Sequence, residues 1–278
     1  EAVKSFEKAL TIKPDFAEAY SNLGNTLKDL EKLDAAVKCY EKALAIKPDY
    51  ADAHNNLGAT QMDLGQLDEA VKSYKKSLEL NPKNHSARHQ LNSLLGRNSQ
   101  SAPKEYVENL FNKYANKFED SLVNKLEYTM PSLLRKAFLD SAFAKNNIRR
   151  TIDLGCGTGL CGVEFKDLTE TLIGVDISEK MISKAQEKNI YDELYVNDLI
   201  SGLKELEGTF DLFISSDVFV YLGDLKDLFN TVSEYTTKHS LFVFSTEDND
   251  GDSFNLRQSG RYAHSKKYIA QLASTSGF

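Results

Sequence analysis

The sequence has no long hydrophobic run, few cysteines and no excess of positive charge. No stretch of its 278 residues approaches the roughly 18 apolar residues that a membrane span needs. Cys39, Cys156 and Cys161 are too few and too scattered for a disulfide framework or a metal site, so we expect a reducing, cytoplasmic location and no bound metal. The charged, amphipathic residues 1–10 are unlike a secretory signal.

The charge balance disfavours nucleic acid as a partner. The chain has 34 Lys and Arg against 41 Asp and Glu, a net charge of −7. The whole imbalance lies in residues 101–278, with 20 basic and 27 acidic side chains, whereas residues 1–100 are neutral. Binding to a phosphate backbone requires a basic surface, which this composition does not provide.

The first hundred residues repeat with a period of 34. This spacing relates Pro14, Pro48 and Pro82, also Ala2, Ala36 and Ala70, and also Phe6, Tyr40 and Tyr74. The pair Leu23-Gly24 recurs as Leu57-Gly58. Each unit predicts two amphipathic helices that approach closely at the glycine and end at the proline. Since the chain begins with Glu1 partway through a unit, we expect a piece of a longer protein.

Residues 1–87 resemble the tetratricopeptide (TPR) family, so an α-helical TPR solenoid is expected over residues 1–96. A helix at 85–96 has Asn92 in place of the glycine and is expected to cap the open end. The resemblance implies a concave face that carries Asn22, Asn25, Asn55 and Asn56. Their amides suit an extended peptide or protein partner, although a scaffold or a homo-oligomer contact remains the alternative.

The second half changes to alternating strands and helices. Residues 97–104 are polar and predict a linker, and residues 105–149 predict a helical extension or lid. Strands are then expected at 150–154, 171–176, 193–197, 210–215 and 240–245, and helices at 160–168, 178–188, 224–237 and 266–276. This alternation is typical of a doubly wound, Rossmann-like α/β domain with a parallel sheet, here residues 150–278.

A glycine-rich turn follows the first expected strand. Residues 155–159 have the spacing G-x-G-x-G, preceded by Asp153, and acids end the next two strands at Asp176 and Asp198. A dinucleotide site would instead need glycine at the position of Leu160. An acid before the turn would repel a pyrophosphate but suits the ammonium of an amino acid. S-adenosylmethionine, which has that ammonium and no phosphate, fits better.

These motifs resemble the class I S-adenosylmethionine-dependent methyltransferases over residues 105–278. The matching segments are Ile152–Gly159, Val175-Asp176, Asn197-Asp198 and Phe210–Ser216. With the repeats, the chain resembles bacterial predicted TPR-containing methyltransferases, a group that implies no particular acceptor. The resemblance implies S-adenosylmethionine as methyl donor, S-adenosylhomocysteine as product, and contacts to the ribose from Asp176 and to adenine from Asp198. The full set of expected cofactor residues is Asp153, Gly155, Cys156, Gly157, Asp176, Ile177, Asp198, Leu199, Ser215, Ser216 and Tyr114.

Tyr114 is the candidate lid residue, in a segment where the resemblance also places Phe111 and Phe118 over the site; a core aromatic is the alternative. The family implies two further strands after the fifth, and the chain stops at Phe278, so we expect a sheet lacking its last strands.

Loops after the fourth and fifth strands hold the candidates for acceptor binding. Asp217 and Tyr221 follow the fourth strand, and Arg257, Arg261, Tyr262 and His264 follow the fifth. Paired arginines would suit a carboxylate or phosphate, with Asp217, Arg257, Arg261 and Tyr262 for substrate binding and His264 or Tyr221 for catalysis. Structural roles are the alternative, and Ser265 is typical of a helix N-cap.

Three functions stay open. In the first, a methyltransferase uses its TPR segment to recruit a protein. In the second, a small-molecule methyltransferase uses it for dimerisation or docking. In the third, the chain is a non-catalytic TPR adaptor with a cofactor-binding fold.

Overall fold

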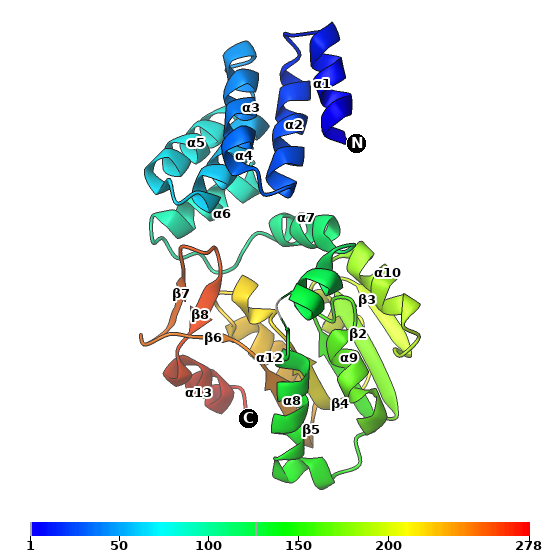
Figure 1. Cartoon of the computed structure of the whole chain (residues 1–278). Helices are drawn as coiled ribbons and strands as arrows, with labels where there is room; N and C mark the ends of the chain where they lie inside the picture. The colour runs from blue at the N-terminus through cyan, green and yellow to red at the C-terminus, as the bar shows by residue number, and fades with distance from the viewer. Residues whose placement is uncertain (1, 126) are drawn as a thin grey trace. The chain divides into compact units, whose positions relative to one another are not determined.

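The computed structural model describes residues 2–125 and 127–278 (Figure 1). The chain divides into two compact units. One unit comprises residues 1–97 with 257–260, and the other comprises residues 98–256 with 261–278. The division thus falls at the start of the polar segment that the sequence predicts to be a linker.

The first unit consists of antiparallel helices. They are α1 (Ala2–Ile12), α2 (Ala17–Asp29), α3 (Leu33–Ile46), α4 (Ala51–Asp63), α5 (Leu67–Leu80) and α6 (His85–Leu94). Pro14, Pro48 and Pro82 lie in the turns after α1, α3 and α5, as the repeat predicts. The helical solenoid predicted from the period of 34 is therefore confirmed.

Each repeat is held together by a tyrosine that packs onto a glycine. Tyr40 of α3 is fully buried, and a Cβ atom added at Gly24 of α2 would lie 2.6 Å from its ring. Tyr74 of α5 is buried in the same way, with its ring 3.1 Å from the corresponding point at Gly58. Glycine is needed at position 24 because a side chain there would overlap the Tyr40 ring and separate the paired helices, whereas the contact at Gly58 is looser.

The second unit is built on a five-stranded parallel sheet in the order β3-β2-β1-β4-β5. Its strands are β1 (Arg150–Leu154), β2 (Thr171–Asp176), β3 (Glu193–Val196), β4 (Phe210–Ser215) and β5 (Thr236–Phe244). The chain winds outward in one direction from β1 and in the other from β4. The strand order therefore reverses between β1 and β4, and ligands bind in such folds at the carboxyl ends of the strands there.

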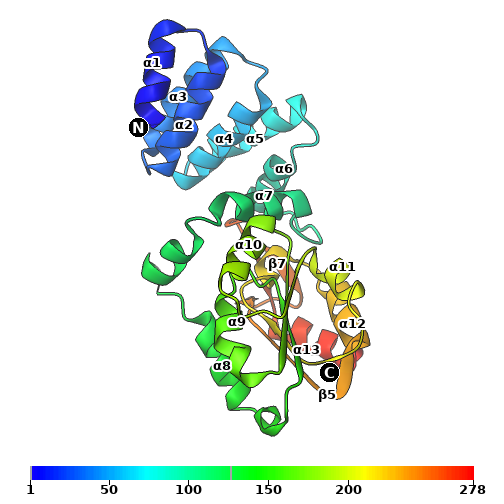
Figure 2. The same cartoon turned by 90° about the vertical axis from the view of Figure 1, so that its right-hand side faces the viewer.

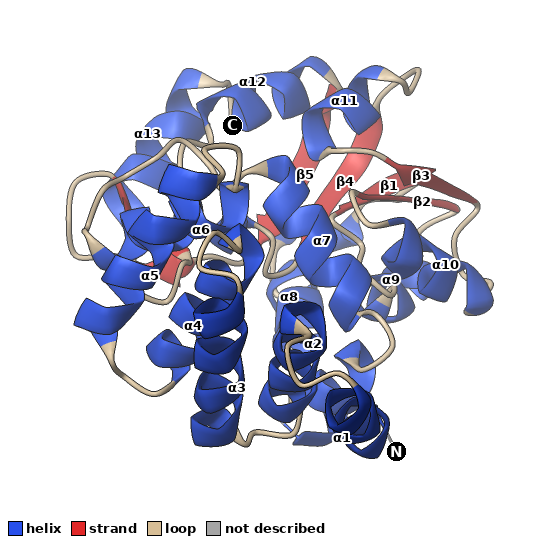
Figure 3. Ribbon diagram, turned by 90° about the horizontal axis from the view of Figure 1, so that it is seen from above, coloured by secondary structure: helices blue, strands red, loops and turns tan. Residues whose placement is uncertain are grey.

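Helices cover both faces of this sheet (Figures 2 and 3). One face carries α8 (Met130–Leu139), α9 (Leu160–Phe165) and α10 (Glu179–Glu187), and the other carries α11 (Leu199–Lys204), α12 (Lys226–Glu234) and α13 (Lys266–Thr275). The apolar residues of β4 pack into separate cores on its two sides, and those of β1 pack into one of these cores. The residues on the other face of β1, Thr151 and Asp153, are also buried, so both strands are buried on both faces. The Rossmann-like architecture is thus confirmed. Among the described residues, no strand pairs with the outer edge of β5.

The structure differs from the sequence prediction in the helical extension. The segment divides into α7 (Lys104–Tyr114), a π-helical turn (Asp120–Lys125), α8 and a 3₁₀ turn (Ala142–Lys145). Pro131 lies in the first turn of α8, a position that favours a new helix start. The pattern of aromatic residues from Tyr106 to Phe118 continues past the end of α7 at Tyr114, so it does not show where that helix ends.

A second, three-stranded sheet was not predicted. It consists of β6 (Glu247–Asp248), β7 (Phe254–Leu256) and β8 (Tyr262–His264), in the order β6-β8-β7. These strands have two or three residues each, too short for an alternating pattern to register. The N-cap role of Ser265 is confirmed, since its hydroxyl accepts from the Tyr268 amide at 3.1 Å.

The start of the second unit is firmly attached rather than a free linker. The Asn98 amide group contacts the backbone of Phe254 and Leu256 at 3.2 and 2.8 Å. The Gln100 carbonyl accepts from Gly223 and Asp224, and the Ala102 amide donates to the Tyr221 carbonyl at 2.9 Å. These residues therefore form part of the α/β unit. No helix among the described residues is both long and apolar enough to cross a membrane.

The tyrosine–glycine packing predicts a difference between two alanine substitutions. Gly24→Ala places a methyl group 2.6 Å from the Tyr40 ring, and the overpacking should cost about 1–3 kcal/mol, partly offset by alanine's better helix propensity. Gly58→Ala meets its ring at 3.1 Å and should be nearly neutral. Thermal unfolding followed by far-UV circular dichroism should show the larger loss for Gly24→Ala; the reverse order would contradict this packing.

Candidate functional site

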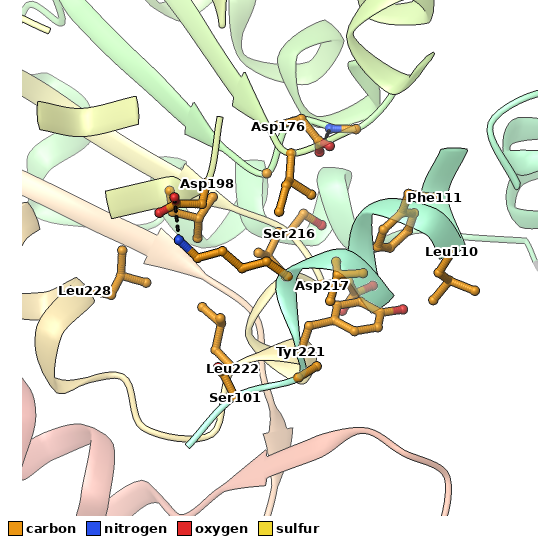
Figure 4. A pocket seen from close by; sticks show the side chains of 18 of the residues that line it. Ser101, Leu110, Phe111, Asp176, Asp198, Ser216, Asp217, Tyr221, Leu222 and Leu228 are labelled. Carbon is orange, nitrogen blue, oxygen red and sulfur yellow. Dashed lines mark hydrogen bonds and ion pairs between the residues drawn. The ribbon is translucent and has the colours of Figure 1, made fainter. Parts of the chain in front are cut away.

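A cavity of ≈ 650 Å³ lies at the carboxyl ends of the parallel strands. The turns after β1, β2, β3 and β4 form its floor, and α7 with the residues around it forms a wall (Figure 4). Its volume falls in the range of small-molecule sites, roughly 300–1,000 Å³. This is the position where a doubly wound sheet is expected to bind a ligand.

The glycine turn after β1 brings the backbone to the cavity. Gly155 and Gly157 have φ angles of 77° and 54°, in the left-handed region that favours glycine. A Cβ atom at Gly155 would lie 2.3 Å from the Val218 side chain, so no other residue fits there. The Gly155 amide donates to the Val175 carbonyl at 2.8 Å, which fixes the turn against β2.

Asp176, at the end of β2, is held by two backbone amides. Its Oδ2 accepts from Gly157 at 2.9 Å and its Oδ1 accepts from Ser178 at 2.8 Å. Burial raises the pKa of this carboxyl to about 6, although the two amides oppose the shift. The carboxylate therefore has one fixed orientation on the cavity floor beside the glycine turn.

Asp198, after β3, is the next acid along the same edge. Its Oδ1 caps α11 by accepting from Ser201 at 3.1 Å, and its Oδ2 pairs with the Lys104 ammonium at 2.7 Å (Figure 4). Burial opposes ionisation, but the hydrogen bonds from Lys104 and Ser201 outweigh it and lower the pKa of Asp198. Asp198 is thus an anionic group at the cavity.

The loop after β4 supplies a polar cluster. Tyr128 and Ser216 share a hydrogen bond of 2.8 Å between their hydroxyls. Asp217 has a φ of 55°, unusual for a residue other than glycine, and the Ser245 hydroxyl bonds both its backbone amide and its carboxylate. That hydroxyl accepts from the Asp217 amide at 2.7 Å and donates to its carboxylate at 3.0 Å.

A row of aromatic rings forms the opposite wall. Tyr114 contacts Phe118 with ring centroids 5.7 Å apart, Phe118 contacts Phe111 at 6.2 Å, and Phe111 contacts Tyr221 at 5.3 Å. All three pairs meet edge to face, and all four rings line the cavity. The wall thus offers both aromatic faces and edges to a ligand.

The structure brings most of the predicted site residues to this one cavity. They come from six separate segments of the chain. The residues that line it are Gly155, Gly157, Asp176, Ile177, Asp198, Leu199, Ser216, Asp217, Tyr114, Tyr221 and Arg261.

Asp153 is not among the lining residues. It is fully buried in β1, and its Oδ2 accepts a hydrogen bond of 2.7 Å from the Tyr191 hydroxyl. Burial raises the pKa of Asp153 to about 7, the Tyr191 bond opposes the shift, and the nearby Asp176 charge adds to it. Asp153 therefore lies behind the glycine turn, in the floor of the site rather than at its surface.

Two other predicted cofactor residues also lie in the interior. Ser215 is fully buried, and its hydroxyl donates to the Leu154 carbonyl at 2.8 Å, which joins β4 to β1. Cys156 is buried, its thiol pKa is raised by burial, and it does not line the cavity. Both side chains support the strands that carry the turn.

His264, the predicted general base, is buried away from the cavity. Its Nε2 donates to the Gly223 carbonyl at 2.9 Å and its Nδ1 faces the Thr246 hydroxyl at 2.6 Å. Burial lowers its pKa, which favours the neutral ring. Since both ring nitrogens are engaged, His264 ties β8 to its neighbours and is not placed to take a proton from a ligand.

The other residues of that segment also lie outside the cavity, with one exception. Tyr262 is fully buried with its hydroxyl 2.6 Å from that of Ser99, and Arg257 is exposed in the turn after β7. Arg261 lines the cavity, but its guanidinium is paired with Glu247 at 2.6 Å. The loop therefore does not present the paired arginines that the sequence analysis favoured for a carboxylate or phosphate.

Sequence reasoning missed several lining residues. Lys104 and Ser101 were assigned to a linker, and Tyr128 follows the break in the helical extension. None carries a motif, and only the fold brings them to the strand ends. The polar composition of residues 97–104 gave no signal that they would form part of a site.

The predicted groove asparagines lie on α2 and α4. Asn25 accepts from the Tyr40 hydroxyl at 2.8 Å and from the Asn56 amide at 3.0 Å, and Asn55 donates to Asn56 at 3.3 Å. Asn25 and Asn56 thus join neighbouring repeats, Asn55 bonds to its neighbour on α4, and Asn22 is exposed. No group of three or more His, Cys, Asp or Glu side chains in the described part of the chain is arranged to hold a metal.

Comparison with protein families agrees with this geometry. A family model described as a methyltransferase domain matches residues 145–275. Models described as TPR repeat and tetratricopeptide repeat match residues 1–30, 24–65 and 51–84. The chain combines N-terminal tetratricopeptide repeats with a methyltransferase domain. Its glycine turn, Asp176 and Asp198 all fall within the matched methyltransferase segment.

Individual relatives of the methyltransferase domain are distant. A malonyl-[acyl-carrier protein] O-methyltransferase of Bacillus anthracis is 29% identical over 146 residues, 51% of this chain and 53% of that protein. A ribosomal protein L11 methyltransferase of Thermotoga neapolitana is 34% identical over 102 residues, 34% of this chain and 36% of that protein. The chain thus spans about half the length of these curated relatives or less.

A solved structure shows the same fold. The SAM-dependent methyltransferase of Leishmania major has a TM-score of 0.50 and 15% identity, and the match covers 65% of this chain and 76% of that one.

The burial of Asp153 predicts a dependence of stability on pH. Its pKa rises from 3.8 to about 7 on folding, so between these values the folded protein keeps a proton that the unfolded chain has released. The Asp153 carboxyl therefore lowers the free energy of unfolding as the pH rises above 3.8. This loss of stability reaches its full size above the pKa of about 7 in the folded protein. Asp153→Asn should raise the melting temperature much more at about pH 8 than at about pH 5, where only part of the penalty has developed.

Differential scanning fluorimetry at the two pH values tests this. Asp227→Asn, an exposed substitution on α12 with the same change of charge, is the control and should shift the melting temperature equally at both. An equal effect of Asp153→Asn at both pH values would show that its carboxyl ionises normally.

Proposed function

We propose that the chain is an S-adenosylmethionine-dependent methyltransferase whose TPR segment recruits a protein acceptor or a protein that carries the acceptor. The observation that supports it is that the glycine turn, Asp176 and Asp198 line one cavity at the reversal of strand order. Each offers a group that matches part of the methyl donor.

The donor's nucleoside fits the acidic side of the cavity. Asp176 is fixed by two amides and keeps lone pairs for two ribose hydroxyls. Asp198 is an acceptor suited to the amino group of adenine, with Leu199 beside it as an apolar surface. The turn at Gly155 and Gly157 has no side chains to obstruct a ligand lying across it.

The methionyl end then lies toward Ser216 and the aromatic wall. Tyr114 and Phe118 line the same cavity, and the Phe118 ring lies 4.0 Å from the point where a Cβ atom at Gly157 would be, so these rings would help to exclude water from a bound donor. The bound donor supplies an electrophilic methyl group on a sulfonium. The protein's contribution is to align an acceptor with it, and such alignment supplies several kcal/mol of barrier lowering.

Asp176→Ala should weaken the binding of S-adenosylhomocysteine at least about tenfold, because it removes a paired contact to the ribose worth roughly 1.5–3 kcal/mol. Isothermal titration calorimetry of the full chain measures this. Asp250→Ala, an exposed change in the loop after β6, is the matched control and should bind as the wild type does. Unchanged affinity of Asp176→Ala would mean that the ribose lies elsewhere. If the folded wild type gives no heat with S-adenosylmethionine or S-adenosylhomocysteine, the chain is a non-catalytic adaptor.

The recruitment role rests on the repeats. TPR solenoids present a surface formed by successive helices, and here the exposed Asn22 and the half-buried Asn56 lie on α2 and α4. Their amides can donate to and accept from the backbone of an extended peptide. A partner bound in this way would be held close to the methyltransferase domain and would reach it at a raised effective concentration.

Replacing Asn22 and Asn56 together by alanine should therefore remove labelled protein bands when a lysate is incubated with labelled S-adenosylmethionine. Affinity for S-adenosylhomocysteine should not change, because neither residue belongs to the α/β unit. Lys75→Ala, an exposed change on α5, serves as the control. If the bands persist in the double variant, the methyltransferase finds its protein acceptor without Asn22 and Asn56, and recruitment through these residues is wrong. If the wild type labels no protein band, the acceptor is a small molecule instead.

A further inference from the structure

The cavity carries an imbalance of charge that bears on the methyl acceptor. Its described lining includes five carboxylates, from Asp176, Asp198, Asp217, Asp224 and Asp227, and two cationic side chains. Both cations are engaged by carboxylates, Lys104 with Asp198 at 2.7 Å and Arg261 with Glu247 at 2.6 Å. An anionic acceptor would have to compete for these cations in a negative field.

The end of the cavity beyond Ser216 combines that negative charge with aromatic rings. Burial raises the pKa of the Tyr128 and Tyr221 phenols, and the nearby Asp217 carboxylate adds to both shifts. Asp217 lines the cavity together with both tyrosines, and its neighbour Ser216 bonds to the Tyr128 hydroxyl. Tyr221 continues into the row formed by Phe111 and Phe118. Figure 4 shows Asp217 between Ser216 and Tyr221.

Aromatic faces next to a carboxylate attract cations. A ring face binds an ammonium group through its quadrupole, and the carboxylate adds direct charge attraction and a hydrogen-bond acceptor. A carboxylate or phosphate would gain neither contact here. Neutral apolar acceptors would fill the wall but leave Asp217 without a counter-charge.

The position of Asp217 is also built into the backbone. Its left-handed conformation costs about 1 kcal/mol for a residue with a side chain, and the Ser245 hydroxyl bonds both its amide and its carboxylate. The carboxylate is therefore held in place before any ligand arrives, which is typical of a binding group.

We infer that the methyl acceptor is a basic amine, received as a cation between the Asp217 carboxylate and the rings of Phe111, Phe118, Tyr128 and Tyr221. This inference rests on the proposed methyltransferase activity and names its substrate class. In the transfer, the ammonium bound beside Asp217 first loses one proton to solvent and becomes a neutral amine. The nitrogen lone pair then forms the C–N bond while the C–S bond breaks with its electrons left on sulfur, and the product leaves as a methylammonium ion.

Three probes of one shape test the inference: benzylamine, benzyl alcohol and benzoate, which are cationic, neutral and anionic at neutral pH. Their dissociation constants are measured by NMR saturation transfer on the full chain loaded with S-adenosylhomocysteine. We expect benzylamine to bind about tenfold more tightly than either of the others. Benzoate binding as tightly as benzylamine, or no preference among the three, would overturn the inference.

Asp217→Asn identifies the residue responsible. Asparagine tolerates the left-handed conformation and keeps an oxygen for the Ser245 hydroxyl, so the loop should fold as before. We expect the preference for benzylamine to fall about tenfold with S-adenosylhomocysteine affinity unchanged. Phe111→Leu, which removes a ring but keeps an apolar side chain, should lower the preference less, and the exposed Asp250→Asn should not alter it.

The outcomes separate this inference from the proposed function. Failure of the wild type to bind S-adenosylhomocysteine counts against the methyltransferase proposal itself. Normal binding of S-adenosylhomocysteine without a preference for the amine counts against the acceptor class alone. Loss of S-adenosylhomocysteine affinity in Asp217→Asn, with the probes unaffected, would assign Asp217 to the donor's own ammonium and overturn the inference.

Discussion

The hydrogen bonds that Asp176 accepts from Gly157 and Ser178 hold the candidate site together. They join the turn after β1 to the turn after β2, so that two loops separated by a helix form one surface. Burial raises the pKa of the Asp176 carboxyl, but its orientation is fixed because both hydrogen bonds come from backbone amides. The glycines are required by the same arrangement, since the backbone must come this close to the acid without a side chain between them.

Behind this surface lies a second buried acid, which does not line the cavity. Asp153 contacts Tyr191, and its pKa is raised to about 7 by burial and by the charge of Asp176. Two carboxylates under one turn repel each other, so the site favours a state in which one of them is protonated or faces a positive ligand. A donor that carries two positive groups would reduce this repulsion, which is consistent with the proposed cofactor.

The sequence predicted those parts of the fold that depend on periodicity and on short motifs. The period of 34 located the TPR helices, and the β1 and β2 motifs placed Gly155 and Asp176 at one edge. It could not place residues whose role comes from long-range packing. Lys104 reaches Asp198 across 94 positions of the chain, and no local pattern encodes such a contact.

The segment around His264 shows the opposite case. Its arginines, tyrosine and histidine are residue types that often serve catalysis, but the strands β7 and β8 turn the histidine and Tyr262 into the interior. Residue types identify which side chains are capable of catalysis or binding. Whether such a side chain faces the cavity depends on its place in the strand, because the direction alternates from one residue to the next. The β strands here are too short to show that alternation, so the direction of each side chain was not predictable.

The use of glycine in this domain bears on what Asp217 does. At positions 155, 157 and 159 the backbone is left-handed and the chain has glycine, which adopts that conformation without strain. At position 217 the backbone is also left-handed, yet the residue is an aspartate. Glycine there would relieve the strain and would keep the amide bond to Ser245, but it would remove the carboxylate. The chain therefore keeps a carboxylate at the end of β4, on a cavity that also has a wall of aromatic rings, and this is the arrangement that the inferred amine acceptor would require.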